Sequence, residues 1–301
     1  MISTEKAMKM MDEYLDQHSG EIKSETDIER LIASFTEEYN ASLGNEDVEK
    51  TVYDYLDEAD NAETKEEHMD ALKKALAIEP DNPDVQMKII LAEKGDDADE
   101  LLDALSALIS KISGEKSMQN HLQHDVGSFW GILDTRPYMR VRQKYMDTLV
   151  ECGMFTAAAE EGEELIKLNK ADNLGIRFVL MSIYAFREDE KSAQALHHKY
   201  ENADETQMLL PLAVLYYKKR KFKKAGEYLG RLMKRNKDTR DFFRKMSDKE
   251  ESEKLLSNLP PYYTWFSIEE LAAAVYENTF LYSSTPTFFI WGKRWFSRNG
   301  K

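Results

Sequence analysis

Residues 212–236 read LAVLYYKKRKFKKAGEYLGRLMKRN, and this stretch decides the fold. Two apolar runs with helical spacing flank a short cationic segment that is typical of a turn. Aligning upstream segments on Ala225 brings Ala193 and Ala158 to the same position, at separations of 32 and 35 residues. A period of this length is typical of stacked helix pairs, because one pair alone cannot bury its apolar face. The sequence therefore predicts an array of helix pairs.

The three copies resemble tetratricopeptide (TPR) repeats, in which a small residue, a tyrosine pair, an aromatic and an alanine hold fixed positions. The most regular copy carries these residues at Ala213, Tyr216, Tyr217, Phe222 and Ala225. The segment HMDALKKALAIEPDNP (68–83) resembles the second helix of a further unit, including its closing proline. This resemblance implies an all-α, TPR-like α-solenoid, a right-handed superhelix of antiparallel helix pairs.

A narrower resemblance covers residues 129–178, FWGILDTRPYMRVRQKYMDTLVECGMFTAAAEEGEELIKLNKADNLGIRF. This segment is similar to the centre of a bacterial TPR-protein family that shares FWG…TRPYMR, then a helix pair, then DN-x-GIR. The chain departs from that pattern at Lys170, where proline is usual. Because no enzymatic activity is established for the family, the resemblance implies fold more than function.

Composition excludes several function classes. Among 301 residues there are only 13 glycines and 7 prolines, too few for the many tight turns of a strand protein. A single cysteine, Cys152, rules out an internal disulfide, and no His or Cys spacing suits a metal. No catalytic signature occurs, neither a phosphate-binding glycine loop nor HExxH. We therefore expect a non-enzyme without cofactor or metal.

No targeting or membrane signal is evident in the sequence. The N-terminal residues lack the apolar core of a signal peptide, and no apolar run reaches 18 residues. These features predict a cytoplasmic protein without a membrane span.

Charge is unevenly distributed, and it suggests a division of the chain. Residues 1–115 hold 31 acidic and 11 basic side chains, whereas residues 116–301 hold 25 acidic and 30 basic ones. We expect acidic helical repeats over 1–115, a joint over 116–135, TPR-like repeats over 136–258 and capping helices over 259–301. The overall net charge of −15 argues against nucleic acid as a partner. The opposite balance of the two halves allows homo-oligomers in which an acidic half meets a basic half.

Several helix starts can be recognised from capping residues in the sequence. Thr64 with Glu67, and Ser267 with Glu270, form capping-box patterns. Asn45 is a candidate cap for the helix that carries Val52 and Leu56.

Two arginines, Arg142 and Arg177, occupy the same repeat position, where TPR units usually place a large residue inside the helix pair. A half-buried arginine needs a carboxylate or carbonyl partner, which Asp134, Asp172 or the 160–164 run could supply. One interpretation is a structural salt-bridge lock between repeats. The other is an anion pocket, which holds a carboxylate or phosphate by bidentate contacts. Its arginines would be Arg136, Arg140, Arg142 and Arg177.

The first helices of TPR units line the concave face of an array, which suits peptide binding. The predicted function is therefore a non-catalytic scaffold that binds a protein or peptide in this groove. The alternative is an anion- or small-molecule-binding protein or an enzyme that uses the arginine-rich centre. The predicted binding residues are Arg136, Arg140, Arg142, Gln143, Asp147, Arg177, Phe178, Ser182, Tyr217 and Lys218. The same face would also present Phe186, Gln207 and Val214.

The densest basic run spans 218–224 and continues to Lys245, with Phe242 and Phe243 beside it. Base stacking on these rings is one interpretation, and a solvated turn between two helices is the other. The final aromatic segment after Pro286 is predicted to cap the array.

Overall fold

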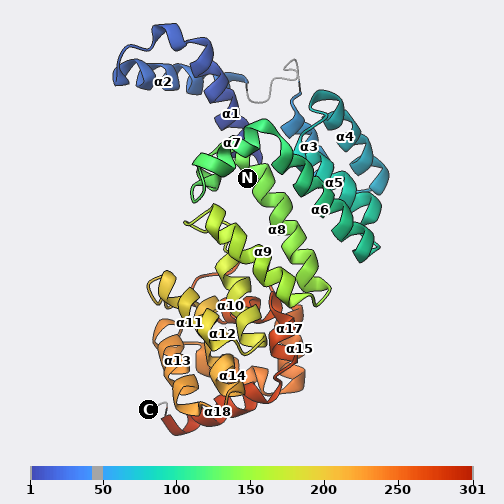
Figure 1. The fold of residues 1–301 in the computed structure, drawn as a ribbon. Helices are drawn as coiled ribbons and strands as arrows, with labels where there is room; N and C mark the ends of the chain where they lie inside the picture. Colours follow the sequence, from blue (N-terminus) through green and yellow to red (C-terminus); the bar gives the residue numbers. More distant parts are fainter. Residues whose placement is uncertain (1, 43–49, 300–301) are drawn as a thin grey trace. The chain divides into compact units, whose positions relative to one another are not determined.

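A computed structural model describes residues 2–42 and 50–299, and this part of the chain is all-α (Figure 1). Helix accounts for 78% of the structure, and the described residues form 18 α-helices and no strand. The helices are α1 (Ile2–Gln17), α2 (Glu25–Ser42), α3 (Val52–Asn61), α4 (Lys65–Ile78), α5 (Pro83–Lys94), α6 (Ala98–Gly114), α7 (Lys116–His124), α8 (Arg136–Glu151), α9 (Phe155–Leu168), α10 (Ile176–Phe186), α11 (Glu190–Lys199), α12 (Thr206–Lys218), α13 (Phe222–Arg235), α14 (Thr239–Met246), α15 (Lys249–Ser257), α16 (Ile268–Tyr276), α17 (Thr279–Ser283) and α18 (Thr287–Asn299). Three 3₁₀ turns, η1 (Ser19–Glu21), η2 (Phe129–Gly131) and η3 (Leu133–Thr135), complete the description.

The chain divides into two compact units. The N-terminal unit runs to Met154 and includes Lys167–Ala171, and the C-terminal unit consists of Phe155–Ile166 and the chain from Asp172 onward. The expected joint over 116–135 lies within the N-terminal unit as α7, η2 and η3. The four-part division drawn from the sequence stays a prediction.

Local capping explains where the helices of the N-terminal unit begin. The predicted capping box at Thr64 is confirmed, because its hydroxyl accepts from the Glu67 amide and the Glu67 carboxylate accepts in return. Asn82 caps α5, which starts at Pro83, and Asp97 caps α6. Thr51 is the N-cap residue of α3, and the predicted cap at Asn45 lies outside the described residues.

A small apolar cluster holds α3, α4 and α5 together. Its most buried members are Val52, Leu56, Leu72, Ala75 and Val85, which the helical spacing of each segment turns inward. All of these side chains come from helices whose ends are capped, so short helices of 10 to 14 residues are stabilised by packing and capping together.

Five helix pairs share one turn length. Three residues separate α3 from α4, α5 from α6, α8 from α9, α10 from α11, and α12 from α13. The three alanines that align the repeat, Ala158, Ala193 and Ala225, are fully buried. Small residues at these places let neighbouring helices approach closely.

In the C-terminal unit, α18 covers α13 and α14 with an aromatic face. A Cβ atom added at Gly226 would lie 2.4 Å from Trp295, and one added at Gly292 would lie 2.3 Å from the Phe243 ring. Both glycines are therefore required by close approach of the helices. Phe288, Phe289 and Phe296 are buried in the same contact. Within the described residues, no helix combines the length and the apolar character needed to cross a membrane.

Candidate functional site

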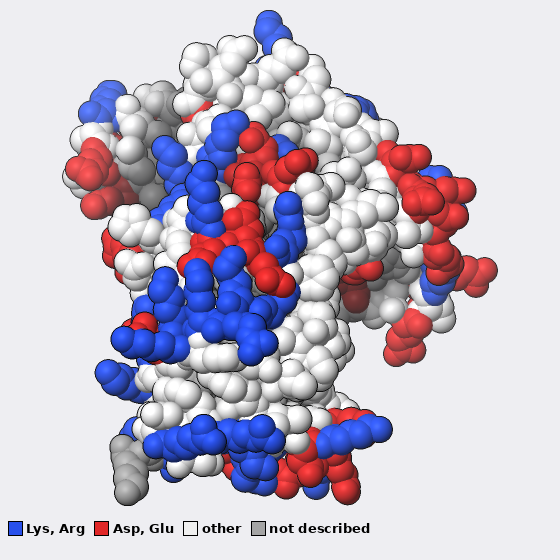
Figure 2. All heavy atoms as spheres, turned by 60° about the horizontal axis from the view of Figure 1, so that its bottom comes forward, with Lys and Arg blue, Asp and Glu red and all other residues white. Residues whose placement is uncertain are grey.

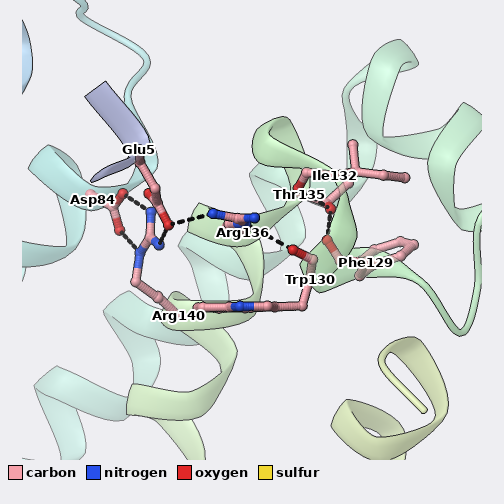
Figure 3. A network of polar contacts seen from close by, with 8 residues as sticks. All are labelled: Glu5, Asp84, Phe129, Trp130, Ile132, Thr135, Arg136 and Arg140. Carbon is pink, nitrogen blue, oxygen red and sulfur yellow. Dashed lines mark hydrogen bonds and ion pairs between the residues drawn. The ribbon is translucent and has the colours of Figure 1, made fainter. Parts of the chain in front are cut away.

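Arg140 of α8 lies between two carboxylates from distant parts of the chain (Figure 3). Its Nε and Nη2 donate to both oxygens of Asp84 at 2.8 and 2.6 Å, a bidentate contact. Its Nη1 donates to Glu5 Oε1 of α1 at 2.8 Å. One guanidinium therefore joins α1, α5 and α8.

Arg136, one helical turn before Arg140, contacts the same Glu5 oxygen through Nη1 at 3.4 Å. Its Nε donates to the main-chain oxygen of Trp130 at 2.8 Å, and its guanidinium lies 5.4 Å from the centre of the Trp130 indole. Figure 3 shows the guanidinium above the plane of that ring. The Thr135 hydroxyl holds the preceding turn by donating to the main-chain oxygens of Phe129 and Ile132.

We call Arg136, Arg140, Glu5 and Asp84 the Arg140 cluster. The carboxylate side chains of Glu5 and Asp84 are each only 5% exposed. Two arginines oppose two carboxylates, so the buried charges balance, as they must to be tolerated away from water. Burial alone would lower the pKa of Arg140, but the contacts with Asp84 and Glu5 outweigh it and raise that pKa.

Helix α1 contacts the rest of its unit through several ion pairs. Among its described side chains, Glu5 is the only one that is buried. Lys6 Nζ lies 2.6 Å from Asp54 Oδ1, and Lys9 Nζ lies 3.2 Å from Glu79 Oε1 and 5.8 Å from the centre of the Tyr53 ring. A helix held this way contrasts with the usual case, in which an apolar stripe is buried.

These contacts persist over a wide pH range. Burial tends to raise the pKa of Asp54, but hydrogen bonds from Lys6 and Thr51 outweigh it and lower that pKa. Burial tends to lower the pKa of Lys9, but Glu79 outweighs it and raises that pKa. A lowered carboxylate pKa adds stability that is lost in acid, and a raised lysine pKa adds stability that is lost in strong base. Both contacts are therefore present at neutral pH.

An acidic groove of about 520 Å³ runs beside α1. Its carboxylates come from Glu5, Glu79, Asp81, Glu115 and Asp134, and Lys9 is its one Lys or Arg. Tyr53, Ile78, Ile112, Met118, Leu133 and Pro137 supply apolar surface. A second hollow of about 270 Å³ shares Lys9, Tyr53, Ile78 and Glu79 with it. Mixed acidic and apolar walls suit a basic, partly apolar segment.

The second arginine site lies in the C-terminal unit. Arg177 Nη1 is 2.9 Å from Asp172 Oδ2, and its Nη2 is 2.7 Å from Glu205 Oε1. The guanidinium also faces the rings of Phe178 and Tyr200, at 4.0 and 5.2 Å. We call Arg177, Asp172 and Glu205 the Arg177 cluster. Among the candidate partners that the sequence offered for the two arginines, Asp172 contacts Arg177 in the structure.

The structure separates the remaining predicted binding residues into different roles. Ser182, Gln207 and Val214 are buried, so in this conformation they do not line an open face as the repeat register predicted. Lys218 donates to the main-chain oxygens of Ala185 and Phe186, and thus caps the end of α10.

Tyr217 is covered by α18, since its hydroxyl donates to Thr287 at 2.9 Å and its ring lies 5.2 Å from that of Trp291. Gln143 is half-buried, and Arg142 contacts the hydroxyl and ring of Tyr138. Burial raises the pKa of Asp147, which is also half-buried, to about 6, although Lys144 favours the charged form.

Most basic side chains of residues 218–224 form ion pairs with carboxylates of the same chain. Lys219, Lys221 and Lys224 surround Glu190, and Arg231 pairs with Asp204. Figure 2 shows basic side chains gathered on this face with acidic ones among them. Phe242 and Phe243 are fully buried, so the interpretation in which they stack on bases is wrong.

Glu5 and Asp84 are the residues that the sequence did not reveal. Asp84 reads as an ordinary acidic residue in the first turn of a helix, and Glu5 lies on a helix with many exposed charges. Only the fold brings them to Arg140. In the described part of the chain, no three His, Cys, Asp or Glu side chains are placed to hold a metal ion.

Comparisons with protein-family models, with curated proteins and with solved structures find no match to this chain.

Proposed function

We propose that this chain is a non-catalytic TPR-type scaffold that binds a segment of a partner protein in the N-terminal unit. The TPR-like superhelix is supported by five helix pairs with three-residue turns and by the buried alanines of the repeat. The resemblance of residues 129–178 to a bacterial TPR family points the same way.

The binding site in this proposal is the acidic groove together with the Arg140 cluster. The observation that carries it is the groove's composition, in which the exposed carboxylates of Glu115 and Asp134 join three ion-paired ones, Glu5, Glu79 and Asp81, around an apolar strip. A basic helix or extended segment would gain apolar contacts along the strip and charge pairing at its rim. The partner class is therefore a protein segment rich in Lys or Arg.

A charge-reversal experiment tests the proposal. Glu115→Lys with Asp134→Lys alters the groove at two exposed positions that are in none of the ion pairs of α1. Glu29→Lys with Glu37→Lys is the matched control on the exposed face of α2. The wild-type chain and the control should capture the same proteins from a lysate, and the groove variant should lose those with basic segments. Identical captured sets for all three chains would refute the proposal.

The alternative is a site for a small anion, with the arginines as ligands. Its support is that Arg140 and Arg136 already hold one carboxylate that belongs to a separate helix. A free anion would have to displace Glu5 to use the same guanidinium groups. Titration with inorganic phosphate at constant ionic strength tests this alternative directly.

A further inference from the structure

Helix α1 has the chemistry of a bound ligand. It presents a carboxylate, Glu5, to two arginines, and two ammonium groups, Lys6 and Lys9, to Asp54 and Glu79. Each of its main ionic groups meets a group of opposite charge on a different element. Such point-by-point complementarity is what specifies the orientation of a helix on a protein surface.

We propose that α1 is an internal ligand, and that the partner of the N-terminal unit docks a helix of the same charge order in its place. This inference rests on the proposed function and specifies a helix that enters the site by displacing α1, whose Glu5 and Lys9 form part of the groove wall. The required order is an acidic residue, a basic residue directly after it, and a second basic residue three positions later. This is the spacing of Glu5, Lys6 and Lys9.

The geometry explains why the site would select this order of charges. Positions i and i+4 lie on one face of a helix, so Glu5 and Lys9 point toward the same wall of the site. The residue at i+1 lies about 100° around the helix, and the long Lys6 side chain reaches sideways to Asp54. The Arg140 cluster thus selects the carboxylate, while Asp54, Glu79 and the Tyr53 ring select the two ammonium groups.

The same contacts explain how α1 can leave. Apart from Glu5, the described side chains of α1 are half-buried or exposed, so none of its apolar side chains in this range is fully buried against the rest of the unit. The Lys6–Asp54 and Lys9–Glu79 pairs are partly exposed, so water and salt screen them and each contributes little, whereas the buried Glu5 carboxylate is the contact that a replacing helix must itself supply. Helix α2 packs on α1 through the Tyr14 and Phe35 rings, so the two helices can move together. Elements with few buried contacts are the ones that open locally while the rest stays folded.

A peptide competition experiment tests the inference on the full chain. The probe is a labelled peptide of residues 2–17, and the key variant is Lys6→Glu with Lys9→Glu in the chain. That variant changes only the internal ligand and leaves Arg140, Asp54 and Glu79 intact. The peptide should bind the variant at least tenfold more tightly than the wild-type chain, because the tethered competitor is weakened. Lys65→Glu with Lys73→Glu, two exposed lysines of α4, is the charge-matched control and should behave as wild type.

Two further measurements close the test. Amide hydrogen exchange in α1 should quicken at least tenfold in the Lys6→Glu, Lys9→Glu chain and stay unchanged in the control. A probe peptide with the same two substitutions should lose binding to every chain.

Equal peptide binding by the wild-type chain and the variant, or no binding by the variant, would overturn the internal-ligand inference. Unchanged exchange in α1 would overturn it as well. Release of α1 by inorganic phosphate alone, at constant ionic strength, would assign the Arg140 cluster to a small anion instead. None of these results alters capture of partners through Glu115 and Asp134, so the proposed function fails or survives separately.

Discussion

The Arg140 cluster and the Arg177 cluster solve the same electrostatic problem with carboxylates from different distances along the chain. Arg140 takes its partners from 56 and 135 residues away, whereas Arg177 takes them from 5 and 28 residues away. Asp172 and Glu205 join the start of α10 to the start of α12 through Arg177. Glu5 and Asp84 join α1 and α5 to α8 through Arg140. Under our proposal, the first arrangement is permanent structure and the second is an exchangeable docking contact.

The backbone around each arginine supports this distinction. Asp172 pairs with Arg177 and also accepts hydrogen bonds from the Ile176 and Arg177 amides, so it caps α10 as well. Losing that pair would disturb a helix start in the core of the C-terminal unit. Glu5, in contrast, accepts hydrogen bonds from the guanidinium groups of Arg136 and Arg140. Losing them would loosen α1 and leave Arg140 paired with Asp84.

The largest loss of stability is expected when the Arg177–Asp172 pair is broken. Arg177→Ala leaves Asp172, whose side chain is 1% exposed, without its guanidinium partner. Removing one partner of a buried pair typically costs about 3–5 kcal/mol, and we expect about 3 kcal/mol in denaturant unfolding of the C-terminal unit.

The pH dependence of this loss carries its own check. Burial already raises the pKa of Asp172 against the opposing effect of Arg177, so the uncharged form becomes accessible as pH falls. The destabilisation by Arg177→Ala should therefore shrink toward pH 4. Arg187→Ala, at an exposed position, is the control and should change little. A loss below about 1 kcal/mol at neutral pH would contradict the view of the Arg177 cluster as a structural lock.

Asp147 allows a further comparison, because the contacts described for it include no guanidinium group. Asp147 lies on the same helix as Arg140, but burial raises its pKa to about 6. Because the folded-state pKa is above the usual value, the folded chain binds the proton more tightly, and its stability falls as pH rises from about 4 to 6. Asp147→Asn should add about 1–2 kcal/mol at pH 7 and flatten this pH dependence.

Denaturant unfolding between pH 4 and 8 measures the effect of this substitution. Asp103→Asn, an exposed change on α6, is the control. A variant with the same pH profile as the wild-type chain would show that Asp147 is solvated.

A smaller loss of global stability is expected when the contact of Glu5 with Arg136 and Arg140 is broken. Glu5→Gln leaves Arg140 paired with Asp84 and keeps an amide oxygen as acceptor in place of the carboxylate, so we expect a loss of global stability of about 1–2 kcal/mol. Hydrogen exchange in α1 should nevertheless quicken, while exchange in α5 and α8 stays the same. Asp12→Asn, an exposed change on α1, is the control. Global destabilisation as large as that of Arg177→Ala would make the two clusters equivalent.

Much of the fold could be predicted from the sequence because its signals are local. The aligned alanines and the capping residues Thr64 and Ser267 all lie where the patterns place them. Helix α7 was harder to predict, because glycines lie on both sides of it in the sequence. Its existence depends on packing of Met118, which is buried.

The candidate site, too, was predictable only where its contacts are local in the sequence. Asp172 is five residues from Arg177, so the repeat register was enough to suggest the pair. Arg140 was predicted to face a ligand, but its partners could not be named from sequence. Complementary charges 56 and 135 residues apart leave no periodic signature. Burial of Ser182 and Gln207 was missed for a related reason, since the register fixes a residue's helical face and not what covers it.

Salt should distinguish the attachment of α1 from that of α10 with the smallest perturbation. The screening length falls from about 10 Å at 0.1 M to about 3 Å at 1 M, and exposed pairs are screened more than buried ones. The Lys6–Asp54 and Lys9–Glu79 pairs are partly exposed, whereas Asp172 is not. Raising sodium chloride over this range should quicken hydrogen exchange in α1 several-fold and leave α10 unchanged. If both helices respond alike, burial rather than the origin of the partners governs these contacts, and α1 is as permanent a part of its unit as α10 is of the other.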